Sequence, residues 1–298
     1  MGDSSTPQLD FLCVGPQRTA TSWLDRALRQ HPQIALPAVV KETFFLDRLF
    51  ERGWEWYWKE FFSTTAEPAG CRGEIAPTVF DHPQAPARLL RHNPKARIIV
   101  CVRDPVKRSL SLYQHYHATS RVGDDFSAAL QRRPEILDAS RYRQHIERWV
   151  AEFGAERVLL VPHSAVDADP LGTVNAIYAF LQLPPVEALP EEVRDRYGAA
   201  VVPRVRWLAM LANRTARLLR ALGLHSIANA GKALGLKALL MDGGRGGPPQ
   251  VAAEHQDELR RTLQQESEFS EALSLQGVVT AAQVAPLLAA GQHRSTHG

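Results

Sequence analysis

Cysteines and long apolar runs are scarce in this chain of 298 residues, and each shortage excludes a kind of protein. The three cysteines, Cys13, Cys71 and Cys101, have no regular spacing, which argues against a disulfide scaffold and favours a reducing compartment. No apolar run approaches the ~20 residues of a membrane-spanning helix. Residues 1–10 also lack the charged-then-apolar pattern of a secretion signal. We therefore expect a cytoplasmic protein without a membrane span.

The chain also carries little net charge. A formal net charge of +3 gives no reason, by total charge, to expect a polyanion or nucleic acid as partner. Lysine is rare, with 6 lysines against 29 arginines, a bias that suits phosphate recognition or simply reflects genomic base composition. The hydrophobic share of 45% is enough for one large core, so length and composition predict a single α/β domain.

The most informative segment is a turn of small residues between a predicted strand at residues 9–14 and a predicted helix. The turn reads Gly15-Pro16-Gln17-Arg18-Thr19-Ala20-Thr21-Ser22. In this context, backbone N–H groups and a helix N-terminus converge on an anion. A P-loop would have Gly at position 20 and Lys at 21, where this chain has Ala and Thr. The turn thus predicts a cradle for a terminal phosphate and gives little support for Mg²⁺-dependent transfer of a γ-phosphate.

A second segment strengthens this interpretation. Residues 97–102 form a continuous apolar run, which is typical of a buried parallel strand, and Arg103 follows at its carboxyl end. Asp104-Pro105 predicts an N-cap and first position of a helix, on which Ser111 lies about two turns further. Open α/β sheets bind ligands at this edge, so Arg103 and Ser111 are candidate phosphate ligands. The alternative for Arg103 is a structural ion pair with Asp104 or Glu74.

The two segments resemble the motifs of sulfotransferases that use 3′-phosphoadenosine 5′-phosphosulfate (PAPS). The first family motif, G-x-x-K-[ST]-G-T-[ST]-x-L, cradles the 5′-phosphosulfate and is similar to residues 15–24, with Arg18 for Lys and Ala20 for Gly. The second, R-D-P-x-x-R-x-x-S-x-Y, binds the 3′-phosphate and is matched throughout by residues 103–113. The resemblance runs from about Phe11 to Leu183 and is greatest to bacterial and heparan-type members.

The resemblance implies a fold and a reaction. The fold is α/β, a single domain with a central, mostly parallel sheet flanked by helices, as in the P-loop-like sulfotransferases. The reaction moves a sulfuryl group from PAPS to a hydroxyl or amine of a small-molecule or sugar acceptor and leaves adenosine 3′,5′-bisphosphate (PAP). Heparan-type enzymes have Lys where this chain has Ile75, which makes a polyanionic sugar a less favoured acceptor.

The resemblance also implies site residues. Glu42, in Lys41-Glu42-Thr43-Phe44-Phe45, is the implied general base, and Arg18 is the implied catalytic cation. His115 and His117 are alternative bases, and an exposed ion pair with Lys41 is the structural alternative for Glu42. The residues implied to bind PAPS are Arg18, Thr19, Ala20, Thr21, Ser22, Trp23, Arg103, Ser111, Arg245 and Gly246. The acidic and histidine residues show no metal-ligand spacing, so we expect no metal.

The chain order predicts three parts. Residues 1–8 read as a disordered leader, 9–280 as the sulfotransferase domain and 281–298 as a C-terminal tail. Within the domain, basic and apolar residues at about 203–245 predict a helical, lid-like region, either packed on the sheet or docking on a membrane surface or partner. A last helix is expected at 256–273. Two other functions stay open, a P-loop-type small-molecule kinase and a catalytically weak PAP-binding protein, and the sequence leaves the oligomeric state open.

Overall fold

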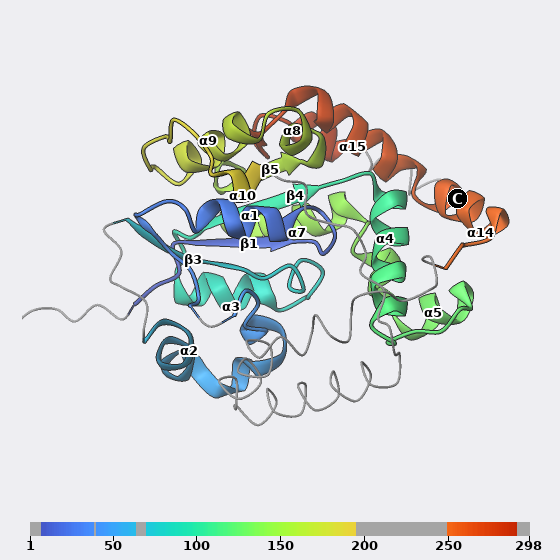
Figure 1. The fold of residues 1–298 in the computed structure, drawn as a ribbon, viewed down its shortest axis with the longest axis horizontal. Helices are drawn as coiled ribbons and strands as arrows, with labels where there is room; N and C mark the ends of the chain where they lie inside the picture. Colours follow the sequence, from blue (N-terminus) through green and yellow to red (C-terminus); the bar gives the residue numbers. More distant parts are fainter. Residues whose placement is uncertain (1–6, 39, 64–69, 195–248, 291–298) are drawn as a thin grey trace, which may run out of the picture. The chain divides into compact units, whose positions relative to one another are not determined.

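The computed structural model describes residues 7–38, 40–63, 70–194 and 249–290 (Figure 1). Most of the expected leader, the whole of the expected lid-like region and the last part of the expected tail lie outside these residues. The predicted ligands Arg245 and Gly246 lie outside them too.

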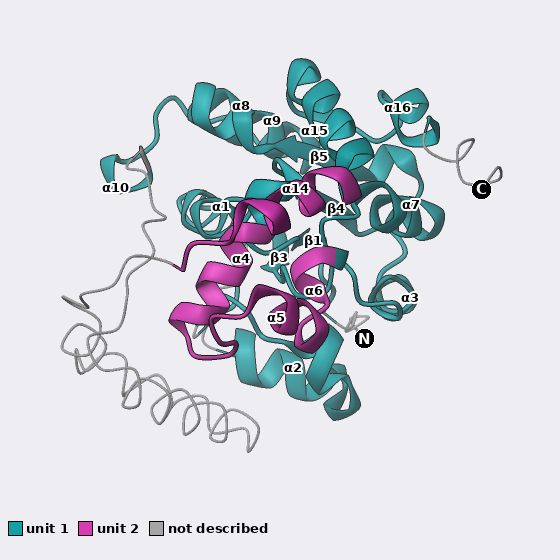
Figure 2. Ribbon diagram, turned by 90° about the vertical axis from the view of Figure 1, so that its right-hand side faces the viewer, with its two compact units in different colours: residues 1–108, 138–197, 263–298 teal, residues 109–137, 198–262 magenta. Residues whose placement is uncertain are grey.

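Contacts divide the chain into two compact units, coloured separately in Figure 2. The first unit comprises residues 1–108, 138–197 and 263–298, and the second comprises 109–137 and 198–262. Helix α4 (Pro105–Ala118) begins in the first unit and continues into the second.

The first unit is built on a six-stranded sheet in the order β2-β3-β1-β4-β5-β6. All neighbouring strands pair in parallel except β6, which runs antiparallel to β5. The prediction of a mostly parallel α/β sheet is therefore confirmed. The strands are β1 (Phe11–Gly15), β2 (Ile34–Ala35), β3 (Cys71–Ile75), β4 (Arg97–Val102), β5 (Val158–Pro162) and β6 (Val279–Thr280).

Helices cover both faces of this sheet, which is why its central strands are apolar throughout rather than alternating. Leu12 and Val14 of β1 belong to the core cluster that contains Leu89 and Trp149, whereas Phe11 and Cys13 belong to the cluster beneath Leu24. The helices of this unit, besides α4, are α1 (Thr21–Leu28), α2 (Gly53–Phe62), α3 (Ala85–His92), α7 (Tyr142–Phe153), α8 (His163–Ala168), α9 (Pro170–Phe180), α10 (Glu191–Arg194), α15 (Gln264–Gln276) and α16 (Ala285–Ala289), with shorter helical turns at Phe45–Leu49, Phe50–Arg52 and Ala155–Arg157.

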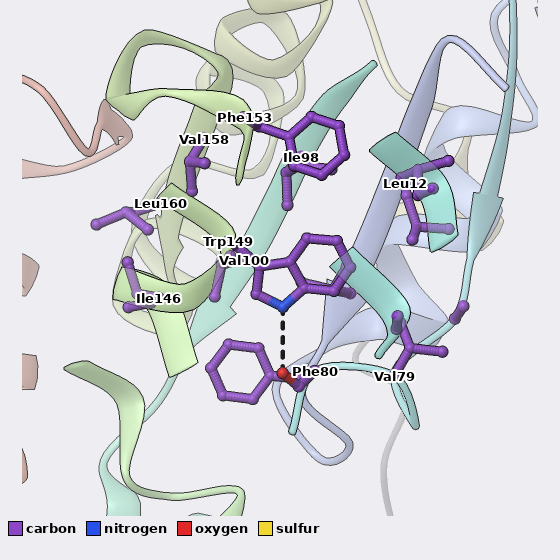
Figure 3. Close-up of a cluster of buried hydrophobic side chains, with 14 of the residues drawn as sticks. Leu12, Val79, Phe80, Ile98, Val100, Ile146, Trp149, Phe153, Val158 and Leu160 are labelled. Atoms are coloured by element: carbon purple, nitrogen blue, oxygen red, sulfur yellow. Dashed lines mark hydrogen bonds between the residues drawn. The ribbon is translucent and has the colours of Figure 1, made fainter. Parts of the chain in front are cut away.

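Trp149 is the largest fully buried side chain of this core. It lies among aliphatic side chains of β1, β4 and β5 (Figure 3), and its indole Nε1 donates to the backbone oxygen of Phe80 at 3.1 Å. A buried indole N–H without a partner costs free energy, so this bond fixes the loop after β3 against α7.

The second unit contains the rest of α4, helix α5 (Phe126–Arg132), most of α6 (Glu135–Asp138) and α14 (Ala253–Thr262). Phe126 packs edge-on against Tyr113, with ring centroids 5.0 Å apart. Ser127 Oγ and His255 Nε2 lie 2.9 Å apart, which joins α5 to α14.

The C-terminal part differs from the expectation of one helix at 256–273. The structure has two helices there, α14 and α15, because the backbone leaves the helical region at Leu263 (φ −105°, ψ 15°). The spacing of buried side chains does not mark this break, since Leu259, Leu263, Ser270 and Leu273 keep the spacing of one helix face. Within the expected tail, Ala281, Val284 and Leu288 are buried in the core, so the described residues up to 290 are folded.

Candidate active site

The turn after β1 requires unusual backbone conformations. Gly15 has a φ of 86°, and a Cβ at this position would lie 2.6 Å from the Cβ of Pro77, so only glycine fits. Arg18 and Ala20 also have positive φ values, 73° and 69°. A left-handed conformation costs a residue with a side chain about 1–2 kcal/mol. The glycine that the resemblance implies at position 20 would avoid that cost, so the turn keeps its shape with Ala20 under some strain.

Two predicted ligands use their side chains inside the protein. Thr19 is almost fully buried, and its Oγ1 donates to the backbone oxygen of Pro16 at 2.6 Å, which closes the turn. Trp23 is buried beneath α1, where its Nε1 donates to the backbone oxygen of Val193 at 2.9 Å. The Trp23 amide donates to the backbone oxygen of Ala20 at 2.9 Å. Both N–H groups of Trp23 thus have partners in the fold, and its role in PAPS binding stays a prediction.

The first residues of α1 offer donors toward the turn. Thr21 and Ser22 are the first two residues of the helix, whose amides have no acceptor inside a helix. Their hydroxyl groups each accept a hydrogen bond of 3.2 Å from Lys41 Nζ. A helix N-terminus with free amides, hydroxyls and an ammonium group favours an anion.

Arg103 reaches the turn from the carboxyl end of β4. Its Nη1 donates to the backbone oxygen of Arg18 at 3.1 Å. Burial, and then the charge of Arg103, lower the pKa of Arg18. The alternative of an ion pair is not what the structure has: Asp104 accepts from the Lys107 amide at 2.6 Å as the N-cap of α4, and Glu74 is bonded elsewhere. Two arginines that follow neighbouring strands thus lie close together, and bound anions would offset their mutual repulsion.

Arg108 is a functional residue that the sequence argument left without a role. It is almost fully buried, its Nε donates to the backbone oxygen of Gln17 at 3.1 Å, and its Nη1 donates to Ser140 Oγ at 3.2 Å. Arg108 therefore stabilises the backbone of the turn through its contact with Gln17. Its place in the second motif was the available signal.

The candidate base lies beside the same turn. Glu42 Oε1 accepts from Lys41 Nζ at 3.3 Å, and about a fifth of each side chain is exposed (22% and 24%). Since Lys41 also contacts the hydroxyls of Thr21 and Ser22, the structure brings Glu42 to the turn through one lysine. The ion pair considered from the sequence is present, and it lies at the candidate site rather than on a remote surface.

A buried carboxyl group anchors the segment that carries Glu42. Glu74 Oε1 accepts from both the amide and the hydroxyl of Thr43, and Glu74 Oε2 accepts from the Tyr57 hydroxyl at 2.7 Å. Burial raises the pKa of Glu74 to about 7, against the opposing effect of these hydrogen bonds. The sequence indicates Glu74 only as an ion-pair partner of Arg103, because residues 43, 57 and 74 meet only in the tertiary fold.

Glu74→Gln is expected to change the pH dependence of stability. Glu74 has a folded-state pKa of about 7 against a usual 4.5, so its charge costs stability once the pH exceeds 4.5, fully so above 7. Glutamine carries no charge, so the variant avoids this cost. Its free energy of unfolding, relative to that of wild type, should rise between pH 4.5 and 8 by about 3 kcal/mol at most. Urea unfolding at several pH values measures this, with exposed Glu152→Gln as control. A difference that stays constant with pH would contradict the prediction.

The remaining predicted residues lie on the part of α4 that belongs to the second unit. They are Ser111, His115 and His117. Within that unit His117 Nε2 lies 2.5 Å from Asp124 Oδ1. Their proposed roles in phosphate binding or proton transfer stay predictions.

Comparison with known proteins decides the family. The model of the sulfotransferase domain matches residues 8–198, which is more than half of the chain. The chain belongs to the sulfotransferase family. The match includes β1, the turn, Glu42 and Arg103, so every described candidate of the first unit lies within the sulfotransferase domain.

The relatives of this sulfotransferase include heparan sulfate enzymes. It is 30% identical over 197 residues to the mouse bifunctional heparan sulfate N-deacetylase/N-sulfotransferase 4, covering 59% of this chain and 22% of the mouse protein. It is 28% identical over 204 residues to human heparan sulfate glucosamine 3-O-sulfotransferase 3B1, covering 61% of this chain and 47% of the human protein. The chain thus spans about a fifth of the first relative and less than half of the second.

A solved structure supports the fold of this sulfotransferase. The sulfotransferase from Alicyclobacillus acidocaldarius superposes with a TM-score of 0.53 at 24% identity, covering 74% of this chain and 97% of that structure. The P-loop-like sulfotransferase fold predicted from the two motifs is confirmed.

No group of three or more His, Cys, Asp or Glu side chains is arranged to hold a metal ion in the described ranges. Among those same residues, no helix is long and apolar enough to cross a membrane. The three cysteines are buried free thiols.

Proposed function

We propose that this protein transfers a sulfuryl group from PAPS to a hydroxyl or amine of a small-molecule or sugar acceptor, with Glu42 as general base. The observation that carries the proposal is the hydrogen bond from Arg103 Nη1 to the backbone oxygen of Arg18. It joins the ends of β1 and β4, the two motif-bearing strands, into one cationic site beside the N-terminus of α1. Such a site suits a nucleotide with a phosphate at each end of its ribose.

The turn would bind the 5′ end of the donor. During transfer the sulfur–oxygen bond to the 5′-phosphate breaks, and negative charge develops on the phosphate oxygen. Donors already pointing at that oxygen stabilise the transition state more than the ground state. Arg18 and the amides of Thr21 and Ser22 are the groups that we assign to this task.

Glu42 would accept the proton of the acceptor. As the new bond forms between the acceptor oxygen or nitrogen and sulfur, the acceptor loses a proton, and a carboxylate within reach takes it. PAP leaves with the electrons of the broken bond. Since the anhydride already activates the sulfuryl group, we propose that the reaction needs no divalent metal.

The acceptor class rests on the relatives and on one substitution. The two heparan sulfate relatives are named for transfer to nitrogen and to a 3-O position, so both amines and hydroxyls occur as acceptors in the family. Ile75, where heparan-type enzymes have lysine, is fully buried at the end of β3 and supplies no charge for a sulfated sugar. We therefore favour a weakly charged small molecule or sugar over a polyanion.

We also propose a cytoplasmic location. Cys13, Cys71 and Cys101 are free thiols, and cysteines without partners are usual in a reducing compartment.

A thermal-shift experiment tests the proposed function. PAP without Mg²⁺ should raise the melting temperature, because a ligand that binds only the folded state stabilises it. ATP with Mg²⁺ should have a smaller effect. Stabilisation by ATP–Mg²⁺ alone would support a kinase instead, and stabilisation by PAP without turnover of PAPS on a panel of hydroxyl and amine acceptors would support a PAP-binding protein. EDTA should leave the PAP effect unchanged.

Arg103→Ala should weaken PAP binding by about 1.5–3 kcal/mol, the range for a hydrogen bond to a charged group. The 3′-phosphate is the expected partner, so AMP, which lacks it, should lose much less affinity. Isothermal titration of both nucleotides measures the difference. Arg97→Ala, at the opposite end of β4, is the matched control. Equal losses for PAP and AMP would mean that Arg103 acts only by holding the Arg18 carbonyl.

A further inference from the structure

Lys41 contacts both the N-terminus of α1 and the candidate base, Glu42. Its Nζ donates to Thr21 Oγ1 and Ser22 Oγ at 3.2 Å each, and to Glu42 Oε1 at 3.3 Å. An ammonium group has three N–H donors, so a bound anion at the N-terminus of α1 would take the place of one of these oxygens. With about a quarter of its side chain exposed (24%), Lys41 is fixed by these contacts and still open to solvent.

The charge of Lys41 also acts on Cys101 of β4. The pKa of the Cys101 thiol is raised well above its usual value by its hydrogen bond with Cys13 and by burial, and the charge of Lys41 opposes that rise. Cys101 is two residues before Arg103 at the carboxyl end of β4. Lys41 comes from the segment between β2 and α2, and its contacts with Thr21 and Ser22 place it beside the turn that Arg103 also contacts.

The turn itself has no lysine, because its only cation is Arg18. A guanidinium presents a planar fork, whereas an ammonium is a compact point charge that fits between closely spaced oxygens. The hydroxyls of Thr21 and Ser22, each 3.2 Å from Nζ, mark where that point charge lies: at the first two residues of α1, whose amides have no acceptor inside the helix. An anion that accepts from those amides comes within reach of Nζ.

We propose that Lys41 is the second cation of the donor site and donates to the 5′-phosphosulfate at the N-terminus of α1, an inference that rests on the proposed function. The same ammonium contacts Glu42, so Lys41 sets the distance between the donor and the base. Its role is distinct from that of Arg103, which we assign to the 3′-phosphate, and the two residues should therefore respond to different nucleotides.

Lys41→Met tests this proposal, since methionine keeps most of the side-chain length and removes the charge. The variant should bind PAP about 10–100-fold more weakly, as expected for the loss of a hydrogen bond to a charged group. The affinity for adenosine 3′-phosphate, which lacks the 5′-phosphate, should change less than about threefold, because the substitution removes no hydrogen bond to this nucleotide. Lys41→Arg should recover part of the PAP affinity, and Lys59→Met, on the exposed side of α2, should match wild type for both nucleotides.

The outcomes separate this inference from the proposed function. If wild type binds PAP and Lys41→Met binds it equally well, Lys41 has no part in the donor site. Equal losses for PAP and adenosine 3′-phosphate would make Lys41 a structural residue and also overturn the inference. If wild type binds neither nucleotide, the proposed function itself fails, and the inference with it. Melting temperatures of all variants, measured without nucleotide, identify any loss of folding.

Discussion

Glu42→Gln is expected to lower sulfuryl transfer by about 10²–10⁴-fold, the usual contribution of a positioned general base. Glutamine keeps the shape of the side chain, and its amide oxygen can still accept from Lys41 Nζ, which lies 3.3 Å from Glu42 Oε1. It cannot take a proton from the acceptor. PAP binding should therefore stay within a few-fold of wild type while turnover falls, which isothermal titration and a transfer assay with PAPS measure separately.

The pH dependence gives a second measure of the same substitution. In wild type the acid limb of the rate profile reports protonation of the base. Glutamine does not titrate, so that limb should be absent from the residual activity of the variant. Glu51→Gln, on the exposed helical turn before α2, is the matched control and should retain the wild-type profile.

The histidines of α4 are the alternative candidates for the general base. If Glu42→Gln turns over within a few-fold of wild type while His115→Ala or His117→Ala is inactive, the base belongs to α4. His117 Nε2 lies 2.5 Å from Asp124 Oδ1, a contact that orients its imidazole ring. Assaying the three variants in parallel therefore decides between the two candidate locations of the base.

The sheet and its ligand-binding edge could be predicted because their signals are local. The apolar run at 97–102, with the arginine after it, identifies a buried strand and the residue at its carboxyl end. The small-residue turn between a strand and a helix similarly identifies the end of β1 and the start of α1 at Thr21. Both signals lie within a few residues of the feature that they predict, so no knowledge of the tertiary fold was required.

The contacts that complete the site could not be predicted because they join distant segments. Lys41 meets Thr21 across twenty residues, and Glu74 meets Thr43 across thirty-one. Arg108 reaches back to Gln17 from the first turns of α4. Each of these contacts depends on how the turn after β1 and the loop after β2 pack against other elements, and no pattern of sequence spacing reports that packing.

One sequence prediction, a single helix at 256–273, was wrong, and the spacing of the buried residues could not have corrected it. Leu259, Leu263, Ser270 and Leu273 are buried at the spacing of one helix face, yet the backbone leaves the helical region at Leu263. Trp23 did carry a signal of burial, since it is a large apolar side chain in the first turn of a helix, which favours the core. Its role in PAPS binding stays a prediction.

Arg18→Ala should lower turnover by about 10²–10³-fold, the scale for the loss of one donor to the transition state. The substitution leaves the fold of the turn largely intact for two reasons. The backbone at residue 18 has a φ of 73°, and alanine pays a similar conformational cost there as arginine does. The group that accepts from Arg103 is the backbone oxygen of residue 18, which every variant keeps. PAP binding should therefore fall much less than turnover, and an Arg18→Ala enzyme with full activity would refute a catalytic role for this residue.

Arg18→Lys separates charge from shape at the same position. It restores the residue that the family motif has, so activity near neutral pH should be substantial and can exceed that of wild type. Burial and the charge of Arg103 already lower the pKa of Arg18, and they would act in the same direction on a lysine. Lysine starts about two units lower, near 10.4, whereas arginine stays protonated throughout the working range. The rate profile of Arg18→Lys should thus gain a basic limb at a pH where wild type is still active. An Arg18→Lys enzyme whose activity follows that of wild type up to pH 10 would mean that the charge of Arg103 does not act on the side chain at position 18.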